Sequence, residues 1–120
     1  MSLIHAYQNR GKTFDITVDG PDGAITPGGN DVLRIVIGRA GRLGVALADA
    51  QLVVTSAAAT ANGSSITIGG GEDSSHRIRL DASDLTFDPG IYSMLVDYFD
   101  NADAEEWKNV DRQCFSLEAT

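Results

Sequence analysis

Cysteine is almost absent from this chain, which has a single one, Cys114, among its 120 residues. A disulfide within the chain is therefore impossible, so packing and hydrogen bonds must hold the fold together. One cysteine and two histidines also do not make up a recognised set of zinc ligands. This cysteine usage is typical of proteins that are made in a reducing cytoplasm.

Long apolar runs and positive charge are also scarce. No apolar stretch approaches the roughly 20 residues of a membrane span, and the first residues lack the charged-then-apolar pattern of a secretory signal. Nine Lys and Arg stand against 17 Asp and Glu, which gives a net charge of −8. Five acids and five bases precede Glu72, whereas twelve acids and four bases lie from Glu72 onward. Nucleic acid and anionic membranes are therefore poor partners, and we expect neither.

The residues that are abundant favour short strands joined by turns. Apolar residues make up 42% of the chain and charged residues 22%, as in ordinary globular domains, and 13 glycines supply turn positions. A chain of this length buries enough surface for one core. We therefore expect a single domain over residues 1–120, with residues 1–11 as a candidate for a loose N-terminal arm.

Strand-like sequence patterns predict seven β-strands. Apolar and polar side chains alternate strictly in Phe14–Val18, and the segment Val32–Gly38 is dense in β-branched residues. Asn62-Gly63 favours the positive φ angles of a type I′ hairpin turn, which would join a strand ending near Ala61 to the next one. Seven short strands with turns between them are the number expected of a β-sandwich. The predicted strands cover residues 14–18, 32–38, 52–55, 65–68, 76–80, 91–99 and 112–117.

The most informative local motif is Asp88-Pro89-Gly90-Ile91-Tyr92. The pattern Asp-x-Gly-x-Tyr is typical of the entry to strand F in immunoglobulin-like sandwiches, where the Tyr hydroxyl hydrogen-bonds to backbone a few residues upstream. We therefore expect Asp88, Gly90 and Tyr92 to form a structural corner. Met94 stands where antibody domains carry a Cys, so packing replaces the disulfide. The sequence predicts an all-β fold, a seven-stranded immunoglobulin-like antiparallel β-sandwich.

The strand predicted over residues 91–99 is apolar on both faces. If Tyr92 points into the core, the residues that point the same way are Met94, Val96 and Tyr98, because strand side chains alternate with a period of two. The residues that then point outward are Ile91, Leu95 and Phe99. An outward apolar row is covered either by a loop or terminus of the same chain or by another subunit. These three outward residues are therefore interface candidates.

A glycine-rich segment, Gly38–Gly44, follows a predicted strand and is similar to a dinucleotide-binding turn, whose glycines let backbone amides approach a pyrophosphate. The glycine spacing departs from that motif and no further strand–helix units follow, so we interpret the segment as a loop between strands. Together with Arg34, the residues Arg39 and Arg42 make a basic patch on an acidic protein. Arg39 and Arg42 are therefore candidates for contact with an acidic neighbouring subunit.

No residue pattern predicts a reaction centre. Asp97–Glu106 is rich in oxygen ligands, but Ala102 and Ala104 break the alternation that a calcium loop needs, and a solvated hairpin tip is the preferred interpretation. Ser74-Ser75-His76 lacks the elbow of a serine nucleophile, and we expect Cys114 at an edge or on the outward side of the last strand. We therefore expect a protein that is not an enzyme and that holds no cofactor and no metal ion.

Two further patterns concern sugars. Asn62-Gly63-Ser64 matches the acceptor pattern for N-glycosylation, although its role in a turn explains it better. Trp107 is interpreted as a packing or interface aromatic, with a stacking platform for a sugar as the open alternative. A sugar-binding surface needs exposed aromatic side chains in a row, and for this the chain offers Trp107, Tyr7 and Phe99.

Six short segments, spread over most of the chain, share an order with a known group of proteins. They are Arg10–Phe14, Asp22-Gly23, Ile78–Leu85, Asp88–Tyr92, Val96–Asp100 and Val110–Leu117. This order resembles small immunoglobulin-like modules encoded in phage and prophage structural gene clusters. Among named families, the order resembles the N-terminal domain of phage baseplate upper proteins. Lys12 departs from the pattern, which has an acid at that place.

The resemblance implies a virion part, such as a tail, neck, baseplate or head-surface protein, that works by assembly contacts without turnover. It carries over no catalytic residue. Such a protein would be made in the bacterial cytoplasm and located in the virion, with other virion proteins or further copies of itself as partners. The alternative is a carbohydrate- or surface-binding β-sandwich module with Trp107 at its binding surface.

Overall fold

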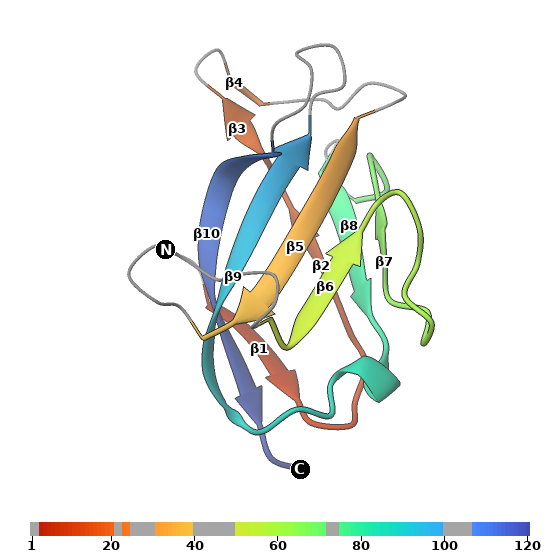
Figure 1. Cartoon of the computed structure of the whole chain (residues 1–120), viewed down its shortest axis with the longest axis vertical. Coiled ribbons are helices and arrows are strands. Elements are labelled where there is room, and N and C mark those ends of the chain that lie inside the picture. Colours follow the sequence, from red (N-terminus) through yellow and green to blue (C-terminus); the bar gives the residue numbers. More distant parts are fainter. Residues whose placement is uncertain (1–2, 21–22, 25–30, 40–49, 72–74, 100–106) are drawn as a thin grey trace.

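The computed structural model of the chain describes residues 3–20, 23–24, 31–39, 50–71, 75–99 and 107–120 (Figure 1). These residues form ten strands and one 3₁₀ turn, η3 (Ala82–Asp84), and none of them belongs to a helix that could cross a membrane. The strands are β1 (Leu3–Tyr7), β2 (Lys12–Ile16), β3 (Asp19–Gly20), β4 (Gly23–Ala24), β5 (Val32–Gly38), β6 (Leu52–Thr55), β7 (Ser65–Thr67), β8 (His76–Leu80), β9 (Gly90–Phe99) and β10 (Trp107–Glu118).

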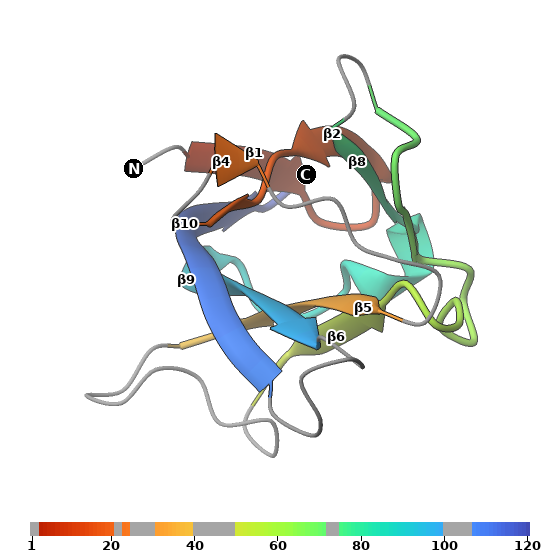
Figure 2. The same ribbon diagram turned by 90° about the horizontal axis from the view of Figure 1, so that it is seen from above.

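The strands build an all-β fold of two larger sheets. One sheet has five strands in the order β1-β10-β9-β5-β6, and the other has three in the order β2-β8-β7. The short strands β3 and β4 pair with each other. Figure 2 shows β2 and β8 across the molecule from β5 and β6, whereas in Figure 1 the two pairs overlap. The three-stranded sheet is antiparallel, but β1 runs parallel to β10, so the five-stranded sheet is mixed rather than antiparallel throughout.

One hydrophobic core lies between the two sheets. Alternate residues of β5, Leu33, Ile35 and Ile37, are fully buried, and β8 contributes Ile78 and Leu80 from the opposite sheet. Burying an aliphatic side chain of this size stabilises a fold by about 1.5–3 kcal/mol relative to leaving it exposed. This core, rather than a disulfide, therefore stabilises a chain whose single cysteine is free.

The seven predicted strands all overlap strands of the structure, but the two larger sheets contain eight. The additional strand is β1, so the interpretation of the first eleven residues as a loose arm is wrong for Leu3–Tyr7. Ala6 is 2% exposed and Ile4 packs against the core. The polar His5 stands between these two residues, and the pairing partner of β1 is more than a hundred positions away. Local alternation alone could not supply that partner.

The turn at Asn62-Gly63 also differs from its predicted form. Gly63 has a φ of 98°, but among the described non-glycine residues only Asn9 has a positive φ. A type I′ turn needs positive φ at both central residues, so this prediction is wrong. The N–H of Gly63 donates to the Thr60 carbonyl at 3.0 Å, and the N–H of Thr60 donates to the Ser64 carbonyl at 2.9 Å. This is the three-residue loop in which glycine takes the left-handed position.

The turn is also not a hairpin within one sheet. It lies in the connection between β6 and β7, and these two strands belong to different sheets. The connection therefore carries the chain from the five-stranded sheet to the three-stranded one.

The corner before β9 has the contact that the sequence predicts. The Tyr92 hydroxyl donates to the Asp88 carbonyl, four residues upstream. The Phe87 ring meets the Tyr92 ring edge-on, with centroids 5.0 Å apart. The Arg39 guanidinium lies 5.2 Å from the centroid of the Tyr92 ring, near Gly90. Met94, two residues after the Tyr, is fully buried in the core.

Candidate interaction surface

The face of the five-stranded sheet that points away from the core carries most of the predicted interface residues; we call it the outer face. On β9 the four predicted inward residues are buried, namely Tyr92, Met94, Val96 and Tyr98. Of the outward residues, Ile91 is 63% exposed, while Leu95 and Phe99 are half-buried. The prediction that β9 is apolar on both faces is confirmed, and Ile91 is its most exposed large apolar side chain.

One end of the outer face is apolar and open. Ile4 and Ala6 pack in or against the core, so the period of two turns the other residues of β1, Leu3, His5 and Tyr7, to the outer side. Leu3 and Tyr7 are among the exposed large apolar residues. Through the intervening strand β10, the register places His5 level with Ile91, about 10 Å away across two strand spacings. Leu3, Tyr7 and Ile91 are called the open apolar end below; His5, between Leu3 and Tyr7, is polar, and its Nδ1 lies 3.6 Å from Glu118 Oε1.

The other end of the outer face is built around an ion pair. Arg34 on β5 and Asp97 on β9 are joined by an Nη2–Oδ2 distance of 2.9 Å, and their side chains are only 12% and 11% exposed. The Arg34 guanidinium lies 3.9 Å from the centroid of the Trp107 ring. Trp107 in turn contacts Phe99, with ring centroids 5.4 Å apart.

An irregularity in β10 completes this arrangement. The register between β9 and β10 shifts between Asn109 and Asp111. At this bulge the Asn109 amide donates to Asp97 Oδ1 at 3.1 Å and to the Val96 carbonyl at 3.2 Å. A bulge re-aims side chains within a strand, and here it brings an amide donor to the second oxygen of Asp97. We call Arg34, Asp97, Phe99, Trp107 and Asn109 the Arg34–Trp107 cluster.

The predicted basic patch is not formed by Arg34 and Arg39. Arg34 points to the outer face and is paired with Asp97, whereas Arg39 lies over the inward-facing Tyr92. Arg39 is exposed and so remains accessible. Arg42 lies outside the described residues, as does most of the glycine-rich segment after Gly38. Arg34 and Arg39 therefore contribute to different parts of the surface.

The aromatic side chains proposed for sugar stacking do not form one row. Trp107 is the first residue of β10, whereas Tyr7 pairs with Glu118, the last. Eleven residues of extended strand separate these ends by about 36 Å. Trp107 is 39% exposed, and the Arg34 guanidinium lies against its ring. Phe99 stands beside Trp107, so only two of the three aromatics are neighbours.

Of the predicted acidic tip and thiol, the structure describes Asp97 and Cys114. Asp97 is paired with Arg34, and residues 100–106 lie outside the description. Cys114 lies opposite Ser93 and Leu3 on the outward side of β10, as expected. The buried His76 accepts a hydrogen bond from the Gly69 N–H at Nδ1, 3.0 Å away. No group of three His, Cys, Asp or Glu suited to a metal ion occurs among these residues.

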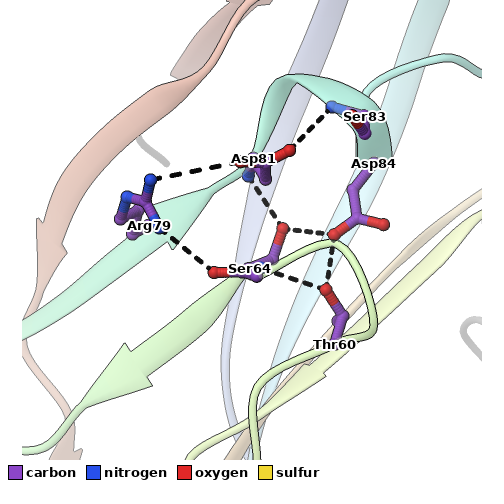
Figure 3. A network of polar contacts seen from close by, with 7 residues as sticks. Thr60, Ser64, Arg79, Asp81, Ser83 and Asp84 are labelled. Atoms are coloured by element: carbon purple, nitrogen blue, oxygen red, sulfur yellow. Dashed lines mark hydrogen bonds and ion pairs between the residues drawn. The ribbon is translucent and has the colours of Figure 1, made fainter.

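A polar network around Asp84 was missed at the sequence level (Figure 3). Asp84 accepts hydrogen bonds from the Thr60 hydroxyl at 2.6 Å, from the Asn62 amide at 2.9 Å and from the Ser64 hydroxyl. Ser64 Oγ also accepts from the Asp81 N–H, and Asp81 caps η3 by accepting from the Ser83 N–H. We call Thr60, Asn62, Ser64, Asp81 and Asp84 the Asp84 network.

The Asp84 network has an electrostatic consequence. Burial on its own would raise the pKa of Asp84, but the hydrogen bonds from Ser64, Thr60 and Asn62 outweigh it and lower that pKa below its ordinary value of 3.8.

The Asp84 network also bears on the glycosylation pattern. The Ser64 hydroxyl, which an acceptor site needs to be free, belongs to a fully buried residue and is engaged with Asp84. The turn interpretation therefore explains this pattern better.

No family model and no curated protein sequence matches this chain.

Proposed function

We propose that the fold is an immunoglobulin-like β-sandwich. The order β10-β9-β5-β6 corresponds to strands G, F, C and C′ of immunoglobulin domains, and β2-β8-β7 corresponds to B, E and D. In this correspondence β9 is strand F, and it begins with the Tyr92 corner. Sheet order and corner support the same assignment independently, because one depends on long-range pairing and the other on a contact across four residues.

We further propose that the protein is a non-enzymatic structural component of a phage or prophage particle, which acts through protein–protein contacts made by the outer face. The observation that carries the proposal is the open apolar end, where Ile91 is 63% exposed and Leu3 and Tyr7 are half exposed. The resemblance of the six sequence segments to virion modules supports the phage origin. Several large apolar side chains exposed on one face of a soluble protein are typical of a surface that a partner covers.

The Arg34–Trp107 cluster suits the same role. Trp and Arg are the residue types that dominate binding energy at protein interfaces. Asp97 and the Trp107 ring hold the Arg34 guanidinium in place before any partner arrives, which reduces the entropy lost on binding. The net charge of −8 keeps free copies apart, while the internal Arg34–Asp97 pair leaves this part of the outer face without net charge.

Light scattering of the purified protein over a wide concentration range tests the proposal. We expect a defined oligomer, or growth with concentration, that the substitution Ile91→Glu abolishes. The matched control is Thr13→Glu, which adds the same charge at an exposed position of β2 on the other sheet and should leave assembly unchanged.

Three other results would redirect the proposal. Equal loss in both variants would mean that added charge acts without regard to the outer face. A monomer at every concentration would exclude self-assembly, and co-purification with products of neighbouring structural genes would then test the particle partners. Glycan binding that Trp107→Ala removes would instead support the carbohydrate-binding alternative.

A further inference from the structure

The turn at Asn62-Gly63 holds two groups that react with each other when they are free. Asn62 is exposed, and its side-chain amide donates to Asp84 Oδ1 at 2.9 Å. The backbone N–H of Gly63 donates to the Thr60 carbonyl at 3.0 Å. Thr60 is itself tied to Asp84 through its hydroxyl at 2.6 Å. Asp84 therefore restrains the Asn62 amide directly and the Gly63 nitrogen through Thr60.

We propose that Asn62 is a site of spontaneous modification by deamidation, and that the Asp84 network controls its rate. The backbone nitrogen of Gly63 attacks Cγ of Asn62, the new N–Cγ bond forms, and the Cγ–Nδ2 bond breaks. Ammonia leaves with the proton from the Gly63 nitrogen, and a five-membered imide remains. One water molecule then opens the imide and gives aspartate or its β-linked isomer at position 62. Water is the only co-reactant.

Glycine at the following position leaves the attacking nitrogen unshielded, because glycine has no Cβ. The folded turn opposes the reaction, since the nitrogen and the amide each make a hydrogen bond that must first break. Reaction therefore proceeds through local opening of the turn, whose population depends on its hydrogen bonds. The Asp84 carboxylate, with its three donors, is the main restraint on that opening.

The product cannot restore the network. A carboxylate at position 62 has no N–H to donate and places a second negative charge beside Asp84. The β-linked isomer also lengthens the backbone of the turn. The modification is therefore one-way: once it occurs, it weakens the tie between the β6–β7 connection and η3. This inference does not depend on the assembly role.

Peptide mapping by mass spectrometry after incubation of the full chain in mildly alkaline buffer tests the proposal. Replacement of NH2 by OH gives a mass gain in the peptide that contains Asn62. We expect the wild-type rate to be about tenfold or more below that of a synthetic peptide of residues 58–67, and Asp84→Ala to raise it by about tenfold. Asn9 and Asn109, measured in the same digest, serve as internal controls because neither precedes glycine.

The controls separate local from global opening. If Asp84→Ala unfolds the chain, the rates at all three asparagines rise together. In that case Thr60→Val, which removes one hydroxyl and keeps the side-chain shape, should still accelerate reaction at Asn62 alone. Wild-type protein that reacts as fast as the peptide, or variants that react no faster than wild type, would overturn the proposal.

Discussion

Asp97 is a buried carboxylate and Asp84 a half-buried one, and they are satisfied by opposite kinds of partner. Asp97 pairs with a cation, Arg34, at 2.9 Å and accepts a hydrogen bond from the Asn109 amide. Asp84 pairs with no cation within the described part of the chain and is held by two hydroxyls and one amide. The first arrangement orders a surface around Trp107, whereas the second ties a connection between sheets to the turn before β9.

The two carboxylates differ in the interaction that offsets the free-energy cost of burying their charge. An ion pair offsets the cost of removing a charge from water by attraction, yet the gain over an uncharged alternative is small. Neutral donors act through charge-assisted hydrogen bonds, each worth about 1.5–3 kcal/mol where the donor would otherwise lose its partner. We therefore expect the Asp84 network to contribute more to folding, and the Arg34–Trp107 cluster to contribute more to the shape of the surface.

The largest effect is expected for Asp84→Ala. The change leaves Thr60 and the buried Ser64 hydroxyl without their acceptor, and we expect a loss of about 3 kcal/mol in the free energy of unfolding. Urea denaturation followed by circular dichroism measures it. Asp88→Ala is the matched control. Asp88 is exposed, and it accepts the hydrogen bond from the Tyr92 hydroxyl with its backbone carbonyl, which alanine keeps. A loss below 1 kcal/mol in the Asp84 variant would contradict the ranking.

A smaller effect is expected for Arg34→Met. It leaves Asp97 with Asn109 as a donor but without its cation, and water can reach the outer face, so we expect a loss of about 2 kcal/mol. The fluorescence of Trp107, the only tryptophan, should change because the guanidinium no longer covers its ring.

Arg77→Met is the control for the buried pair. Arg77 also pairs with a carboxylate, Asp15, at 3.0 Å, but these side chains are 45% and 29% exposed. Its loss should therefore cost about 0–1 kcal/mol. Equal losses in the two arginine variants would show that the burial of the Arg34–Asp97 pair has no energetic weight.

The same contrast separates what the sequence reveals from what it conceals. The Tyr92 corner could be predicted, because its partner is four residues away and the motif is local. The inward sides of β5 and β9 could be predicted too, because the period of two is a property of each strand alone. The Arg34–Asp97 pair joins residues 63 positions apart, and it depends on the register between two strands. No local pattern carries that register.

The Asp84 network escaped for a related reason. Thr60, Ser64 and Asp84 are small polar residues of the kind that fills any loop, and only the packing of the β6–β7 connection against η3 makes them partners. Asp81 alone could have been recognised, because aspartate is a preferred residue just before a helical turn, where its side chain accepts a hydrogen bond from the N–H two residues later. The form of the neighbouring turn was mispredicted because Asn-Gly suits both a type I′ turn and a loop that needs positive φ only at glycine.

The smallest effect is expected in the pH dependence of stability that Asp84 contributes. Hydrogen bonds lower the pKa of Asp84 in the folded chain, so the unfolded chain binds a proton there more readily. This contribution to stability is fully present above the unfolded value, 3.8, and is lost as the pH falls through the folded pKa. Urea midpoints measured from neutral pH down to acid should therefore fall less steeply for Asp84→Asn than for wild type, because the variant has no proton to take up. Identical slopes would show that the Asp84 charge does not stabilise the network, and that the hydroxyls would be as well satisfied by a neutral acceptor.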